Sequence, residues 1–274
     1  MKKIKRRRLN MHHSFFGLTH TPLGKECTAL WDNPKLQSLE QQFQWLLQSP
    51  GLGVLTAEPG IGKTVAMRHL TQKLNPHQYK CFYIAETDFG RLDFYRNMAI
   101  MLGLSSSFRR AKLWRDIKAH ITHMMTQKNI LPIFIIDEAQ NLPNDFFKDL
   151  PAFLNFVFDS KDYMTVWLLG HPVLLRELNK PANAALASRI QVRCQLNPIQ
   201  DRDNFNKLIT HGFEQAGAKQ QLLSDSGVEL IRLASKGNPR QASQLILTAL
   251  RLATDQKISH LPDELILQAI ELRK

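Results

Sequence analysis

The chain has 274 residues, of which 43% are hydrophobic, and its formal net charge is +12. This length is enough for one large domain and a smaller one, and the apolar content is enough for a packed core. The longest apolar runs are far shorter than a membrane span, and the start of the chain lacks the features of a signal peptide. The widely separated Cys27, Cys81 and Cys194 suit buried thiols rather than disulfides or a metal site. We therefore expect a cytoplasmic protein without a membrane segment.

Residues 1–14 form a strongly basic arm. Its positive charges are Lys2, Lys3, Lys5, Arg6, Arg7 and Arg8, and no acidic residue precedes Glu26. Like charges at this density repel one another and attract polyanions, so we expect a disordered arm that binds DNA. The alternatives are a solubilising tail and contact with an anionic membrane surface, although no amphipathic helix accompanies the arm.

The next segment leads into the body of the protein. An apolar, turn-broken stretch over residues 15–23 is expected to pack on the core. A helix is predicted from Asn33-Pro34 to Pro50-Gly51, because one apolar stripe recurs at helical spacing. The stripe consists of Leu36, Leu39, Phe43, Leu46 and Leu47.

Residues 52–64 combine a short buried strand, Val54–Thr56, with a glycine-bearing turn and a helix start. Backbone N–H groups at a helix N-terminus bind anions, and glycines let the chain curl around phosphates. Lys63 is placed to reach the β and γ phosphate oxygens and Thr64 to ligate Mg²⁺. The residues expected to contact a nucleotide are Pro59, Gly60, Ile61, Gly62, Lys63, Thr64 and Val65. Ala57 replaces the usual first glycine, and a chance Gly-Lys-Thr at a helix start is the alternative.

Helices and strands alternate after this loop. A helix to about Leu74, a strand over 81–85, a helix over 92–102 and another starting near Trp114 are expected. A polar, basic loop over residues 105–112 separates the last two helices.

The apolar run Ile133–Ile136 predicts a central parallel strand that ends in Asp137 and Glu138. Open α/β sheets bind ligands at the carboxyl ends of their strands. Asp137 would hold the water shell of Mg²⁺, and Glu138 would orient the attacking water. A helix cap is the alternative, although one acidic residue would suffice for it. Together with the glycine-bearing loop, these residues predict an ATP site that uses Mg²⁺.

Further elements complete two domains. A helix over 143–158 and strands over 166–169 and 190–196 indicate a parallel sheet covered by helices on both faces. From residue 201 onward only helical patterns occur, over about 201–216, 225–235, 239–255 and 262–273. We therefore expect an α/β nucleotide-binding core over residues 15–198 and a helical lid over 199–274.

Five short motifs resemble those of one family, in the same order along the chain. Residues 16–23 resemble its "FGL…PF" opening, 137–140 its "DEAQ", 169–174 its "VGQPEL", 186–190 its "LxxRI" and 237–240 its "GxPR". On these motifs the chain resembles the AAA+ ATPases, and within them the branch of bacterial ExeA-like and transposition-regulator proteins. The resemblance covers residues from about 15 to 272 and implies a P-loop AAA+ sheet core with a C-terminal helical lid.

The resemblance also implies roles for four residues outside the phosphate loop. Arg189 would be an arginine finger for the ATP of a neighbouring subunit, with Arg193 as the competing candidate, and a sheet-surface arginine is the alternative for either. Arg240 would contact the γ-phosphate of its own subunit, or otherwise form a salt bridge at a helix start. His171 occupies the polar sensor position, where the branch more often has glutamine.

Two branches share these motifs. One branch consists of transposition helpers that assemble on double-stranded DNA with ATP, as a ring or filament of identical subunits, and regulate a partner transposase. The other consists of secretion-assembly ATPases with a transmembrane helix. The basic arm and the lack of an apolar span favour the first branch, and a nucleotide-operated adaptor with little turnover is a third possibility. Further DNA contacts are expected from Arg91, Arg109, Arg110 and Lys112, unless these residues form an ordinary solvated loop.

Overall fold

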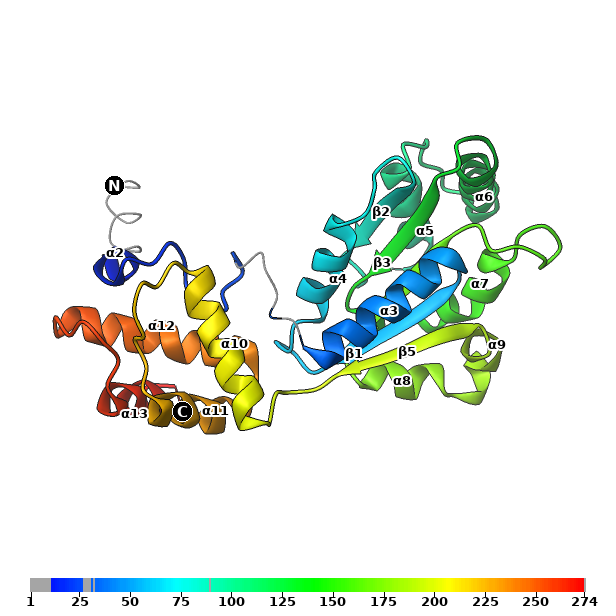
Figure 1. Cartoon of the computed structure of the whole chain (residues 1–274). Coiled ribbons are helices and arrows are strands. Elements are labelled where there is room, and N and C mark those ends of the chain that lie inside the picture. The colour runs from blue at the N-terminus through cyan, green and yellow to red at the C-terminus, as the bar shows by residue number, and fades with distance from the viewer. Residues whose placement is uncertain (1–10, 27–30, 32, 89, 274) are drawn as a thin grey trace. The chain divides into compact units, whose positions relative to one another are not determined.

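The computed structural model describes residues 11–26, 31, 33–88 and 90–273, so the arm residues expected to bind DNA lie outside the described residues. The chain forms two compact units (Figure 1). One is an α/β unit made of residues 34–59 and 63–196. The other is a helical unit made of residues 197–273, 60–62 and the described residues that precede Pro34.

The α/β unit is built on a five-stranded parallel sheet, which confirms the predicted fold class. Its strands are β1 (Leu52–Ala57), β2 (Tyr79–Ile84), β3 (Leu131–Ile136), β4 (Thr165–Gly170) and β5 (Ile190–Leu196). They lie in the order β2-β3-β4-β1-β5, so the apolar strands β1, β3 and β4 are central and buried throughout. The edge strands β2 and β5 are partly exposed. This is the burial expected of a sheet with helices on both faces.

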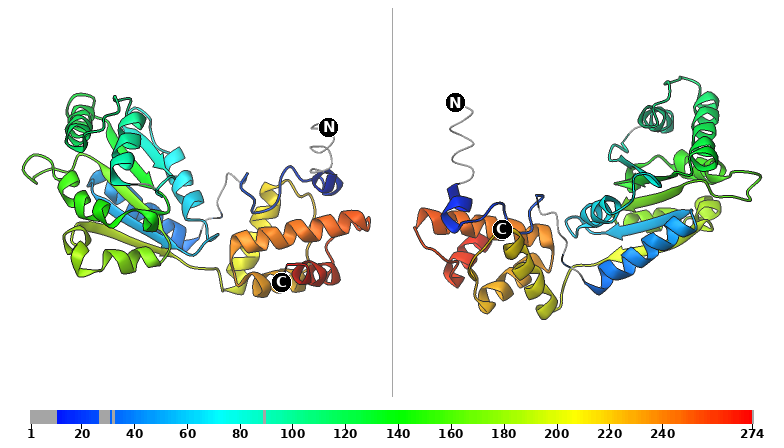
Figure 2. Two further views of the ribbon diagram at one scale, coloured as in Figure 1. Left: turned by 180° about the vertical axis from the view of Figure 1, so that it is seen from behind. Right: turned by 45° about the horizontal axis from the view of Figure 1, so that its top comes forward.

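Helices cover the two faces unequally (Figure 1, Figure 2). On one face lie α3 (Pro34–Gln48) and α4 (Lys63–Gln72), and Phe43 of α3 stacks on Trp167 of β4. The other face packs against an aromatic-rich core that includes Phe94, Tyr95, Phe146 and Phe153. The helices that supply this core are α5 (Arg91–Met101), α6 (Arg110–Gln127), α7 (Asn144–Leu154), α8 (Val173–Leu178) and α9 (Ala184–Ala187).

Several local expectations were wrong. The helix expected over 143–158 ends at Leu154, and residues 157–159 adopt left-handed φ angles of 47°, 57° and 60°. Arg110 and Lys112 belong to the first turn of α6 rather than to a loop. Cys81 lies on the edge strand β2 and is exposed, not buried. The short helices α8 and α9 were not predicted.

The helical unit contains the predicted run of helices. They are α10 (Arg202–Gln215), α11 (Asp225–Ser235), α12 (Pro239–Asp255) and α13 (Asp263–Glu271), preceded by α2 (Met11–Phe16). Asp201, Ser224 and Asn238 cap α10, α11 and α12 by accepting backbone N–H groups.

The segment before α3 packs on the helical unit and not on the α/β core as expected. Leu18 is buried in the core of that unit, and the Thr19 N–H donates to the Ala216 carbonyl at 2.8 Å. The Ser243 hydroxyl donates to the Pro22 carbonyl at 2.8 Å. Among the described helices, none has both the length and the apolar character needed to cross a membrane.

Candidate functional site

The start of α4 and the end of β3 bring four predicted site residues together. Lys63 Nζ donates to Glu138 Oε1 at 2.8 Å, and Thr64 Oγ1 donates to Asp137 Oδ2 at 2.6 Å. Lys63 and Asp137 are buried, with 7% and 4% of their surface exposed. Burial of a charge is costly without a partner, and each of these groups has one.

The turn before α4 needs its glycines. Gly60 and Gly62 have φ angles of 86° and 109°, a region that residues with a Cβ rarely adopt. Ala57, at the position of the missing glycine, is simply the last residue of β1. Lys63 and Thr64 then open α4, so that the unpaired N–H groups of its first turn lie beside the two side chains.

Glu138 is held in an unusual backbone conformation. Its φ angle of 51° is left-handed, which is uncommon for a residue other than glycine. Its N–H donates to Asp137 Oδ1 at 2.9 Å, and its carbonyl accepts from the hydroxyl of the buried Thr87 at 3.1 Å. Strain of this kind persists where the surroundings fix it, as they do here.

The Glu138 carboxylate has a different partner on each oxygen. Lys63 binds Oε1, whereas Gln140 Nε2 donates to Oε2 at 2.7 Å and His171 Nε2 lies 3.4 Å from Oε2. Burial acts to raise the pKa of Glu138, but the hydrogen bonds from Lys63 and Gln140 and the charges of Lys63 and His171 outweigh it. The net shift lowers the pKa of Glu138, so the group is a carboxylate at neutral pH.

Three residues near the acidic pair had no role in the sequence-based prediction. Tyr83, at the end of β2, donates its hydroxyl to Asp137 Oδ2 at 2.9 Å, the same oxygen that accepts from Thr64. Burial, followed by the hydrogen bond and charge of Asp137, raises the pKa of Tyr83. Thr87 and Gln140 are the other two, and Gln140 stood inside a recognised motif. The only available signal was their position: Tyr83 and Thr87 lie at and after the end of β2, and Gln140 follows the acidic pair after β3.

Both candidate finger residues have partners within the α/β unit. Arg189 forms a bidentate ion pair with Asp159, in which Nη1 donates to Oδ1 at 3.0 Å and Nη2 donates to Oδ2 at 2.8 Å. Arg193 donates to Asn179 Oδ1 at 3.1 Å and to the Ala187 carbonyl at 3.4 Å. The guanidinium of Arg189 therefore binds a planar carboxylate through two nitrogens, which is also the geometry in which arginine binds a phosphate.

The basic residues expected to contact DNA are largely neutralised by neighbouring acids. Arg91 and Arg110 both form ion pairs with Asp149, at 3.5 Å and 2.5 Å. Lys112 pairs with Asp116 at 2.6 Å. Arg109 is exposed at the start of α6. Less free positive charge is therefore available here than the sequence suggests.

Arg240 lies in the helical unit as the second residue of α12. Its backbone N–H donates to Asn238 Oδ1 at 3.0 Å and, within the same unit, to the Gly60 carbonyl at 3.3 Å. Its γ-phosphate role stays a prediction.

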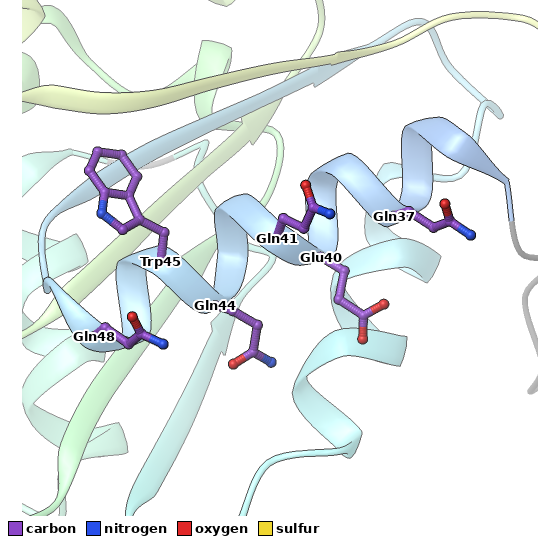
Figure 3. A pocket seen from close by; sticks show the side chains of 6 residues that line it. All are labelled: Gln37, Glu40, Gln41, Gln44, Trp45 and Gln48. Atoms are coloured by element: carbon purple, nitrogen blue, oxygen red, sulfur yellow. The ribbon is translucent and has the colours of Figure 1, made fainter.

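A shallow pocket lies apart from these groups, along a single helix. It is lined by Gln37, Glu40, Gln41, Gln44, Trp45 and Gln48 of α3 (Figure 3). Side chains of one exposed helix face do not converge on a ligand, so we assign it no site.

A parallel sheet in this order, with a glycine turn, Lys-Thr and an acidic pair, defines a P-loop nucleotide-binding fold of the AAA+ type. Residues 46–178 match the family described as "AAA domain". General secretion pathway protein A of Aeromonas hydrophila is 26% identical over 241 residues, which are 84% of this chain and 42% of that protein. The chain thus spans less than half the length of this curated relative.

Solved structures show the same fold at low sequence identity. The Aeropyrum pernix ORC1 protein in complex with DNA has a TM-score of 0.69 and 15% identity, covering 90% of this chain and 67% of that one. Drosophila ORC bound to DNA has a TM-score of 0.68 and 14% identity, over 97% and 66%. The Thermotoga maritima RuvB Holliday junction branch migration motor has a TM-score of 0.57 and 15% identity, over 88% and 69%.

Proposed function

We propose that the chain binds ATP with Mg²⁺ at the start of α4 and hydrolyses it there. The observation that supports this proposal is the pair of contacts that joins Lys63 to Glu138 and Thr64 to Asp137. These contacts place a cation, a hydroxyl and two carboxylates beside a helix N-terminus that attracts phosphate.

Each residue then has one task. Lys63 neutralises the β and γ phosphates, while Pro59, Gly60, Ile61, Gly62 and Val65 enclose them. Thr64 and Asp137 supply the oxygen ligands that suit Mg²⁺, an ion that would offset the phosphate charge. Glu138 accepts a hydrogen bond from the attacking water and orients it. Arg189 reaches the nucleotide of a neighbouring copy, and Arg240 contacts the γ-phosphate of its own chain.

As the cellular process that ATP hydrolysis would drive, we favour an ExeA-like role in assembling a secretion apparatus. The support is the relationship to general secretion pathway protein A, which extends over 84% of this chain. This relationship favours the secretion branch over the transposition branch that the basic arm suggested.

Regulation of a transposase on double-stranded DNA is the second candidate. The net charge of +12 and the six positive charges before residue 9 favour it. In this role, identical subunits would assemble on DNA with ATP. The ion pairs of Arg91, Arg110 and Lys112 reduce the positive charge that these three residues can offer to DNA.

The nucleotide site is tested with Lys63→Ala, with Lys73→Ala as the matched control, because Lys73 follows α4 and pairs with Glu40 on the surface. We expect Lys63→Ala to lose ATP binding and Lys73→Ala to bind as the wild type does. Equal ATP binding by Lys63→Ala would overturn the site. Tight binding without turnover, with or without DNA, would identify a nucleotide-operated adaptor instead.

Measurements of DNA binding distinguish the secretion role from the transposition role. Deleting residues 1–10 from a DNA-binding ATPase should lower the log–log salt slope of affinity by about 2 to 4, at roughly 0.9 per phosphate contact. ATP-dependent assembly on DNA would favour the transposition role, and absence of DNA binding in wild type would favour the secretion role.

A further inference from the structure

The side-chain amide of Gln140 joins the acidic pair to the end of β4. Its Nε2 donates to Glu138 Oε2 at 2.7 Å, and its Oε1 accepts from the backbone N–H of His171 at 3.1 Å. A backbone N–H can only donate and a carboxylate can only accept, so the amide satisfies both partners in one orientation alone.

The space that this amide occupies depends on Gly170. A Cβ added to Gly170 would lie 2.6 Å from Gln140 Oε1. The next closest atoms are Cδ2 and Cβ of the fully buried Leu174, at 2.9 Å and 3.3 Å. Gly170 ends β4 without a left-handed φ angle, so its backbone does not require glycine. Close approach of Gln140 gives a reason for glycine at this position.

The two oxygens of Glu138 have different surroundings. Oε1 binds Lys63, the group that we assign to the phosphates, whereas Oε2 faces Gln140 and His171. If Lys63 turned to a phosphate, as the proposed function requires, Oε1 would be free to accept from water. The contact with Gln140 on Oε2 would still restrict rotation of the carboxylate.

We propose that Gln140 is a positioning residue for ATP hydrolysis, which holds Glu138 by one oxygen and fixes it to the end of β4. This inference rests on the proposed function. Glutamate at position 140 could not donate to Oε2 and would place a second negative charge there, and asparagine is one methylene shorter. Glutamine is therefore the side chain that fits both partners.

The test compares Gln140→Leu with the wild type, with Gln44→Leu on the exposed face of α3 as the matched control. We expect Gln140→Leu to lower kcat about 10- to 100-fold, because misplacement of a catalytic group costs this much. ATP affinity should stay within about twofold, since Lys63 and Thr64 are untouched.

Gly170→Ala supplies an independent check. It should lower kcat in the wild-type background by displacing Gln140, and have little further effect in Gln140→Leu, where the amide oxygen is gone. Hydrogen exchange at the His171 N–H should become faster in Gln140→Leu, which tests the bridge without measuring hydrolysis.

The outcomes distinguish this inference from the proposed function. A wild-type protein that hydrolyses ATP while Gln140→Leu keeps its kcat within twofold would overturn the positioning role alone. A wild-type protein that neither binds nor hydrolyses ATP would overturn both, whatever the His171 N–H shows. A fall in kcat of Gln44→Leu equal to that of Gln140→Leu would also contradict the proposal.

Discussion

Lys63 and Glu138 form an ion pair with Nζ and Oε1 2.8 Å apart, although each is assigned to a different part of the nucleotide reaction. In the proposed function the phosphates attract Lys63 away from Glu138, and Glu138 Oε1 then accepts a hydrogen bond from water. We therefore expect the two events to be coupled, so that binding of the phosphates prepares the group that orients water.

This coupling predicts an asymmetric effect of Glu138→Gln. Turnover should fall strongly because a neutral amide orients and polarises water poorly. ATP affinity should rise by about threefold, since Lys63 is no longer held by a charge and charge-assisted hydrogen bonds exceed neutral ones by about 1 kcal/mol or less at a half-buried site. Calorimetric titration and phosphate release measure the two effects, and undiminished turnover would remove Glu138 from its role.

Tyr83 should affect the Mg²⁺ requirement. Its hydroxyl shares Asp137 Oδ2 with Thr64, so Tyr83→Phe leaves Asp137 less firmly oriented. We expect half-maximal hydrolysis to need about three- to tenfold more Mg²⁺, the equivalent of one lost hydrogen bond. Tyr79→Phe, at the opposite end of β2, is the control and should behave as wild type. An identical Mg²⁺ curve for both variants would show that Tyr83 only supports the strand.

Arg189 should act on a neighbouring copy. Arg189→Ala should bind ATP normally but lose hydrolysis that depends on protein concentration, and mixing it with Lys63→Ala should restore part of the rate. Arg193→Ala is the control, because its contacts are to Asn179 and Ala187. If no mixture recovers activity and Arg193→Ala is the inactive variant, the finger is Arg193.

Removal of the ion pair with Asp159 is a second test of Arg189, in which we expect the rate of hydrolysis to rise. Asp159→Asn releases Arg189 from an exposed partner. We expect the concentration-dependent rate to rise by up to about fivefold, the range of exposed ion pairs. A fall in this rate would mean that Asp159 holds Arg189 in its working position.

DNA contact by the basic start of α6 can be tested with substitutions that should have opposite effects on assembly. Arg109→Ala/Arg110→Ala should weaken assembly on DNA with a non-hydrolysable ATP analogue while ATP binding survives. Asp149→Asn should have the opposite effect, because it removes the acid that pairs with Arg91 and Arg110. Sedimentation with DNA measures both, and no change in either variant would show that this surface is only a solvated helix end.

Acid should weaken the helical unit through His12. Its side chain is buried, and burial, followed by the charges of His13 and Arg251, lowers the pKa of His12 to about 4. Between pH 6.5 and pH 4 the unfolded chain binds a proton that the folded unit does not, so stability falls as pH drops through this window. We expect a loss of about 1 kcal/mol by pH 5 after allowance for solvent screening. Thermal unfolding of His12→Phe should lack this pH dependence.

The sequence predicted the helices and strands that have a regular apolar pattern or that end at a characteristic boundary residue. Val54 and Ile133 stand in apolar runs typical of a buried strand, and Gly237 and Pro239 mark a helix boundary that the structure places before α12. The short α8 and α9, of six and four residues, carry too few turns for a helical period to appear. No local signal favours the left-handed turn at residues 157–159, where none of the three residues is glycine.

The candidate site was predicted where its residues are neighbours in sequence. Lys63-Thr64 and Asp137-Glu138 are two such pairs, and strand order brings them together. The contacts of Tyr83 and Gln140 depend on which strands are neighbours in the sheet. The order of the strands along the chain does not reveal this. Asp149 neutralises Arg110 across 39 positions of sequence, so its effect on the basic surface could not be seen beforehand.

The two units have separate apolar cores, one rich in the aromatic residues around Phe94 and the other built around Phe205 and Ile246. From two separate cores we expect heating to produce two cooperative transitions rather than one. A ligand that binds one unit should shift that transition alone, while acid should shift the one that contains His12. One melting temperature therefore cannot describe this chain, and the effect of a substitution on stability has to be measured for each transition separately.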